Sequence, residues 1–111
     1  MTKTETKIMK AAIEKYGADA QLGMVVEECS ELIQAICKYL RARANTKTSQ
    51  RDFDRRIEAV IEEAADVQIM LDQMSMMGSE WDPSIYRDTL AKIREEKLQR
   101  LQNRLNGKGG R

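Results

Sequence analysis

Two pairs of acidic residues stand out because each pair lies among apolar residues. Glu28 and Glu31 occur in the segment VVEECSEL, and Glu63 and Asp66 occur in the segment VIEEAADV. The members of each pair are three residues apart, so on a helix they are neighbours on one face. An array of carboxylate oxygens suits a hard divalent cation, above all Mg²⁺ and also Mn²⁺. The spacing therefore predicts a magnesium site built from these carboxylates.

The position of the acids at the border of an apolar stripe indicates more than a solvated surface. Carboxylates beside a core are costly unless they are paired or bound to a metal. The chain has no histidine, which excludes the usual zinc sites, the Ser-His-Asp triad and the histidine-containing di-iron bundles. The cysteines Cys29 and Cys37 are too far apart on one helix for a disulfide, and they are expected in the core.

Helices must position these acids, because the chain has one proline and is rich in strong helix formers. The apolar spacing predicts four helices, over about 4–16, 18–43, 52–77 and 84–105. Gly17 ends the first, Ser49 or Asp52 caps the third, and Asp82 with Pro83 begins the fourth. The second and third helices are joined by a short polar loop, so they should lie antiparallel and bring the acid pairs together. The expected fold class is all-α, with a four-helix bundle-like arrangement.

The length of 111 residues corresponds to one domain, which we expect over residues 1–106 with a disordered tail over 107–111. The formal net charge of +1 gives no strong field for nucleic acid or a membrane surface. No apolar run approaches the roughly 18 residues of a membrane span, and the N-terminal segment lacks the apolar stretch of a signal peptide. These properties predict a cytoplasmic protein.

The C-terminal part of the third predicted helix is apolar on nearly every side. Loose core packing by methionine would account for this composition. A subunit interface is the alternative, because a small bundle cannot bury so much apolar surface by itself. The second interpretation predicts a homodimer or a homotetramer. The residues concerned are Val67, Ile69, Met70, Leu71, Met74, Met76 and Met77.

Two segments of the chain resemble the MazG-type nucleoside triphosphate pyrophosphohydrolases, an all-α superfamily that includes the dimeric dUTPases. The segments are QLGMVVEECSELIQAICKYLRAR and IEEAADVQIMLDQM, and the similarity extends over about residues 5–105. The Glu-x-x-Glu and Glu-x-x-Asp motifs of that superfamily fall on Glu28, Glu31, Glu63 and Asp66. The resemblance implies a compact single-domain form like those of phages and bacteria. It also implies Mg²⁺-dependent cleavage of a nucleoside triphosphate to a monophosphate and pyrophosphate by a homo-oligomer.

Roles for further residues follow from this chemistry. Either Glu31 or Glu27, which directly precedes Glu28, is expected to take the proton of the attacking water, and the sequence does not choose between them. Lys38 lies two turns after Glu31 on nearly the same face, so it is a candidate for phosphate binding. Trp81 precedes the fourth helix, where it would stack on a base or serve as a packing anchor. Further phosphate-binding candidates on the fourth helix are Lys97, Arg100 and Arg104.

Two alternatives belong to other functional classes. The first is a non-catalytic interaction or regulatory module with the same fold, which metal-stimulated pyrophosphate release would exclude. The second is nucleic-acid binding through the fourth helix, because residues 87–111 carry eight basic and three acidic residues. The balanced total charge argues against nucleic acid. The nucleotide could be dUTP, dCTP, an oxidised nucleotide or a broad range.

Overall fold

The computed structural model describes residues 1–78 and 80–107, and its regular structure is entirely helical over these residues. The helices are α1 (Lys3–Tyr16), α2 (Ala18–Ala44), α3 (Gln50–Met74) and α4 (Pro83–Leu105). The predicted all-α class is therefore confirmed. The predicted end of the third helix at residue 77 is wrong, because α3 ends at Met74. The next residues form a tight turn in which Met77 N donates to Met74 O at 3.2 Å.

Capping hydrogen bonds explain where α1, α3 and α4 begin. Thr2 Oγ1 accepts from Glu5 N at 3.0 Å, and the Glu5 carboxylate accepts from Thr2 N at 2.9 Å, which is a capping box for α1. Ser49, rather than Asp52, caps α3 by accepting from the backbone N–H of Asp52 at 3.1 Å. Asp82 caps α4 through the N–H groups of its first turn, as predicted.

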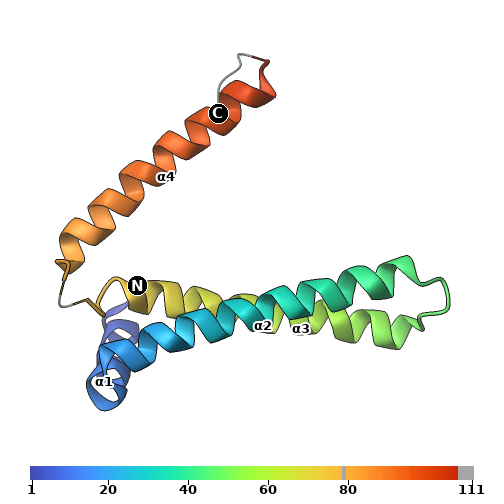
Figure 1. Ribbon diagram of the computed structural model, residues 1–111, viewed down its shortest axis with the longest axis horizontal. Helices are drawn as coiled ribbons and strands as arrows, with labels where there is room; N and C mark the ends of the chain where they lie inside the picture. The colour runs from blue at the N-terminus through green and yellow to red at the C-terminus, as the bar shows by residue number, and fades with distance from the viewer. Residues whose placement is uncertain (79, 108–111) are drawn as a thin grey trace. The chain divides into compact units, whose positions relative to one another are not determined.

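Residues Met1–Met77 form one compact unit, in which α2 and α3 make an antiparallel hairpin and α1 lies across the end away from the connecting loop (Figure 1). Gly17, with φ of +90°, provides the sharp change of direction between α1 and α2. Two contacts set the register of the hairpin. Gln73 Nε2 of α3 donates to Gln21 Oε1 of α2 in a buried hydrogen bond. The rings of Tyr39 and Phe53 meet nearer the loop, with centroids 5.7 Å apart.

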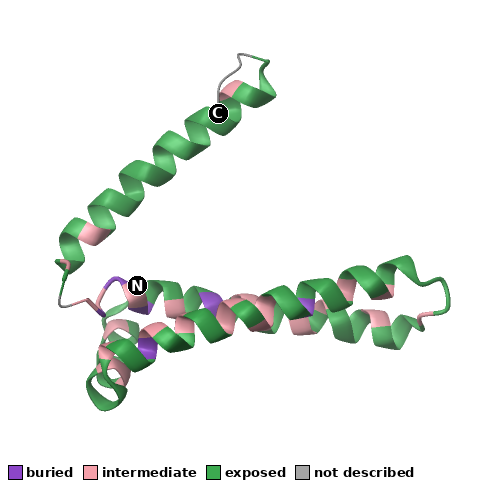
Figure 2. Cartoon of the chain, viewed as in Figure 1, coloured by how far each residue is buried: buried purple, intermediate pink, exposed green. Residues whose placement is uncertain are grey.

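The core of this unit is small and lies between the three helices (Figure 2). The outer side of α2 is apolar but uncovered, since Ile33 is 62% exposed. Core packing, the first interpretation of the apolar end of the third helix, is wrong for Leu71, because this side chain is 46% exposed. Cys29 is half-buried and Cys37 is exposed, so the core prediction is also wrong for Cys37. The buried apolar side chains of the described residues are Met9, Ala35, Val67 and Met77.

The second compact unit begins at Gly78 and contains α4. No residue of α4 is buried, and Leu98 and Leu105 are 51% and 79% exposed. The predicted single domain over 1–106 stays a prediction. The predicted disordered tail covers residues 107–111. Gly107 N donates to Arg104 O at 3.1 Å and so closes the last turn of α4, and 108–111 lie outside the described residues. Within the described part of the chain, no helix has both the length and the apolar character to cross a membrane.

Candidate metal centre

Three of the predicted ligands meet on the facing sides of α2 and α3. Glu28 and Glu31 project from α2, and Glu63 projects from α3, with one oxygen of each within 4.8 Å of the others. All three side chains are half-buried. The spacing of three residues places the first two on one face of α2, and the antiparallel register brings Glu63 opposite them. The structure thus brings together residues that are far apart in the sequence.

Two oxygens in this cluster have no partner among the described residues. Glu28 Oε2 and Glu63 Oε2 are both buried and accept no hydrogen bond. Burial raises the pKa of Glu28 above its ordinary value, and the negative charges of Glu31 and Asp66 raise it further. The same causes, in the same order, raise the pKa of Glu63. Unsatisfied, mutually repelling carboxylates are the donor set that a hard divalent cation or a proton would stabilise.

The remaining predicted acids lie at the margin of the cluster. Asp66 is exposed on α3 and is not part of the group of three close oxygens. Its charge nevertheless reaches Glu28 and Glu63, because it contributes to the raised pKa of both. Glu27 is exposed on α2, whereas Glu31 lies within the cluster. Of the two candidate bases, Glu31 is therefore the one that faces the centre.

A cavity of about 170 Å³ connects the carboxylates to two cations. Its lining includes Glu31 and Glu63 at one end, and Lys38 of α2 and Arg56 of α3 at the other. Lys38 was predicted from the sequence, but Arg56 was missed. The signal for it was present: Arg56 precedes Glu63 by seven residues, just as Lys38 follows Glu31 by seven. In an antiparallel hairpin these equal spacings place the two cations at the same level.

The other predicted substrate-binding residues belong to the second unit. There, Lys97, Arg100 and Arg104 line a groove along α4 together with leucine side chains. Trp81 is half-buried, and its ring lies against Tyr86 with centroids 5.6 Å apart. A Cβ atom added at Gly78 would collide with the Trp81 ring, so the indole packs closely over this glycine. Within its own unit the indole of Trp81 thus contacts Tyr86 and Gly78, and its predicted stacking on a base stays a prediction.

The α2–α3 hairpin thus combines three clustered carboxylates with a neighbouring lysine–arginine pair. Comparison of the chain with protein-family models, with curated proteins and with solved structures gave no match.

Proposed function

We propose that this protein is a Mg²⁺-dependent nucleoside triphosphate pyrophosphohydrolase of the MazG type. The observation that carries the proposal is the cluster of Glu28, Glu31 and Glu63, in which two buried oxygens lack a partner. A purely structural cluster would be expected to pair its buried carboxylates with cations or hydrogen-bond donors. The adjoining Lys38 and Arg56 supply positive charge on one side of the cluster, as a phosphate substrate requires.

The residues present fit a magnesium ion. Glu28, Glu31 and Glu63 would hold it through oxygen atoms alone, with Asp66 at the margin of the site, and Mn²⁺ would suit the same donors. When bound, the ion neutralises phosphate charge and lowers the pKa of a coordinated water. The half-buried position of the carboxylates keeps their charge from being fully screened by solvent.

The proposed reaction is hydrolysis between the α and β phosphates. The oxygen of water forms a bond to the α phosphorus, and the bond from that phosphorus to the bridging oxygen breaks. The electron pair of the broken bond leaves with pyrophosphate, and the nucleoside monophosphate is the other product. The carboxylate of Glu31 takes the proton of the water, with Glu27 as the alternative base. Lys38 and Arg56 stabilise the charge that develops on the departing phosphates.

We also propose that the chain functions as a homodimer or a homotetramer in which the hairpins pack on each other. The support is the apolar surface left uncovered on the hairpin: Ile69 is 50% exposed, and Met70, Met74 and Met76 are partly exposed. Met77 is only 2% exposed within its own chain, so it does not contribute to this surface. A second copy would bury these side chains and would offer Arg100 or Arg104 of its own fourth helix to the site.

Pyrophosphate release from a panel of common and damaged nucleoside triphosphates tests the proposed activity. With Mg²⁺ or Mn²⁺, we expect pyrophosphate and a monophosphate from at least one nucleotide, and no turnover in excess chelator. Glu58→Gln is a matched control, because Glu58 is exposed on α3 and lies outside the carboxylate cluster. Release of orthophosphate alone, or full activity in chelator, would contradict the proposal. The absence of any product would favour a non-catalytic module.

A further inference from the structure

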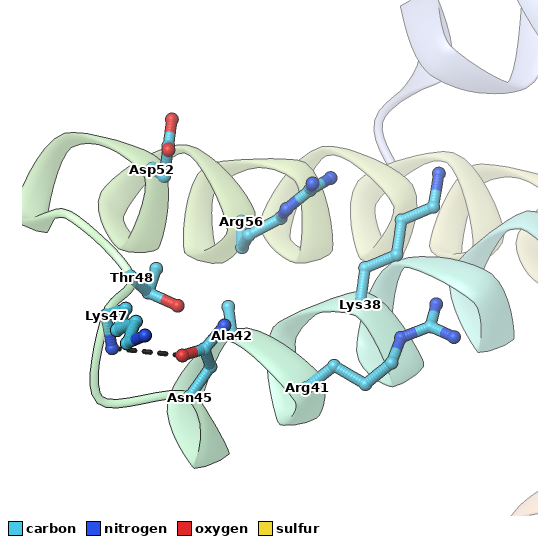
Figure 3. A pocket seen from close by; sticks show the side chains of 8 residues that line it. All are labelled: Lys38, Arg41, Ala42, Asn45, Lys47, Thr48, Asp52 and Arg56. Carbon is cyan, nitrogen blue, oxygen red and sulfur yellow. Dashed lines mark hydrogen bonds between the residues drawn. The ribbon is translucent and has the colours of Figure 1, made fainter.

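A second cavity lies between the end of α2, the connecting loop and the start of α3 (Figure 3). Its volume is about 530 Å³, and four of the side chains around it are cationic. The only carboxylate in the lining is that of Asp52, which in Figure 3 points away from Arg41 and Asn45. The lining residues are Lys38, Arg41, Ala42, Asn45, Lys47, Thr48, Asp52 and Arg56.

The positive charge of this cavity is not neutralised within the described residues. The ion pair found there joins Asp52 to Arg55, at 3.8 Å, and so engages the one acid of the lining with a residue outside it. None of the four lining cations takes part in an ion pair in the described part of the chain. Asn45 Oδ1 accepts from Lys47 N at 3.0 Å, which holds the loop in a defined turn beside the cavity. The cavity therefore presents cations from α2, the loop and α3 whose charge is free for an anion.

This cavity adjoins the smaller cavity of about 170 Å³ at the carboxylates. Lys38 and Arg56 line both cavities, so one track runs from Glu31 and Glu63 through this pair to the loop. Along α2, Lys38 is about 10 Å from Glu31, and Arg41 is about 15 Å from it at 1.5 Å per residue. Lys47 lies farther on, in the loop. The cationic track is therefore longer than the chain of a nucleoside triphosphate whose α phosphate sits at the carboxylates.

We propose that the loop cavity binds the far end of a linear polyphosphate, so that the preferred ligands carry more than three phosphates in a row. The proposal rests on the proposed function for the position of the α phosphate. The leaving group then extends from Lys38 and Arg56 towards Arg41 and Lys47, and the nucleoside extends in the opposite direction. Arginine suits the terminal phosphate because its planar fork donates two parallel hydrogen bonds, and Lys47 adds a point charge.

The test measures binding of pyrophosphate, tripolyphosphate and tetrapolyphosphate by calorimetry, with and without Mg²⁺. Affinity should rise with chain length, and Arg41→Gln and Lys47→Gln should each weaken tetrapolyphosphate binding by about tenfold or more, because a hydrogen bond to a charged group is lost. Arg51→Gln is the matched control, since Arg51 is exposed at the start of α3 and does not line the cavity. This variant should keep the affinity of the wild type.

Three results would contradict polyphosphate binding in the loop cavity. They are equal affinity for all chain lengths, an equal loss of affinity in Arg51→Gln and Arg41→Gln, and displacement of tetrapolyphosphate by a single-stranded oligonucleotide. The last would show an open basic surface rather than a polyphosphate site. Failure of the proposed function is distinguishable, because binding is measured without turnover. A chain that releases no pyrophosphate from nucleotides but still binds tetrapolyphosphate through Arg41 and Lys47 would retain the loop site and lose the enzymatic assignment.

Discussion

Replacing Glu63 by glutamine changes one atom of the carboxylate cluster and removes one of its negative charges. The side chain keeps its shape, so the packing of α2 against α3 is preserved. In the metal-free protein the new amide can donate a hydrogen bond to Glu28, whose Oε2 is buried without a partner. The repulsion that helps to raise the pKa of Glu28 also becomes weaker, since the charge of Glu63 contributes to it. Metal-free Glu63→Gln should therefore be at least as stable as the wild type.

Mg²⁺ should stabilise the wild type much more than Glu63→Gln. At a concentration of about 100 times Kd, a ligand that binds only the native state shifts the folding equilibrium by a factor of about 100. For a domain of about 60–100 residues, this corresponds to a rise in Tm of about 10–20 °C. Changing an outer-shell partner of a metal ligand costs roughly 10–100-fold in affinity, and loss of a ligand should cost at least the upper value. At the same Mg²⁺ concentration, Glu63→Gln should thus gain only a few degrees.

Thermal melts followed by circular dichroism, in chelator and in a series of Mg²⁺ concentrations, measure both effects. Sodium chloride at matched ionic strength removes the contribution of general screening. Glu58→Gln should respond to Mg²⁺ as the wild type does, because Glu58 lies outside the cluster. If Glu63→Gln gains as much from Mg²⁺ as the wild type, Glu63 is not a metal ligand. A metal-free variant that melts well below the wild type would show that the carboxylate stabilises the fold instead.

Three further predictions concern pH, the core and assembly. Glu28 and Glu63 have pKa values raised above 4.5, so the folded metal-free protein binds more protons than the unfolded chain. The free energy of unfolding, taken relative to a Glu28→Gln/Glu63→Gln variant, should be highest below pH 4.5. It should fall as the pH rises through the raised pKa values, and urea melts in chelator would show this. Gln73→Ala leaves the buried Gln21 without its donor, which should cost about 1–3 kcal/mol and lower Tm, whereas exposed Gln68→Ala should not. Light scattering should report at least twice the chain mass of 12.7 kDa, and a fully active monomer would refute the proposed assembly.

The helices could be predicted because their signals are local. A proline after Asp82 and the apolar period of α2 act within a few residues, and they identified both elements. The end of α3 was misplaced because Met76 and Met77 continue the apolar composition while the backbone changes to a turn. Met76 N donates to Gln73 O, three residues earlier, instead of to a carbonyl four residues earlier. Composition does not distinguish these two bonding patterns.

Burial was harder to predict, because α2 has two apolar stripes with the same helical period. Leu32 and Ala35 are on the side that is half or fully buried, whereas Val26 and Ile33 are on a side that is more than 60% exposed. Only the position of α3 decides which stripe is covered. Both stripes have the same helical period in the sequence, so periodicity alone does not show which of them is buried within one chain.

The candidate site shows the same division between local and long-range information. Glu28 and Glu31 could be paired from their spacing, and a short loop was enough to bring Glu63 to them. Arg56 was missed because its relation to Lys38 depends on the register of the hairpin. That register is set by contacts near both ends, including the buried pair Gln21 and Gln73, which no sequence pattern identifies.

The hairpin keeps its clustered glutamates apart from Lys38 and Arg56, and this separation is what leaves both groups available for a ligand. A lysine or arginine four residues from a glutamate would pair with it on the helix surface. Here Lys38 and Arg56 are each seven residues from the nearest clustered glutamate, about 10 Å along the axis. The raised pKa of Glu28 and of Glu63 follows from burial and from neighbouring acids, and no cation is among its causes. A metal–polyphosphate complex would present positive charge to the carboxylates and negative charge to the cations at the same spacing.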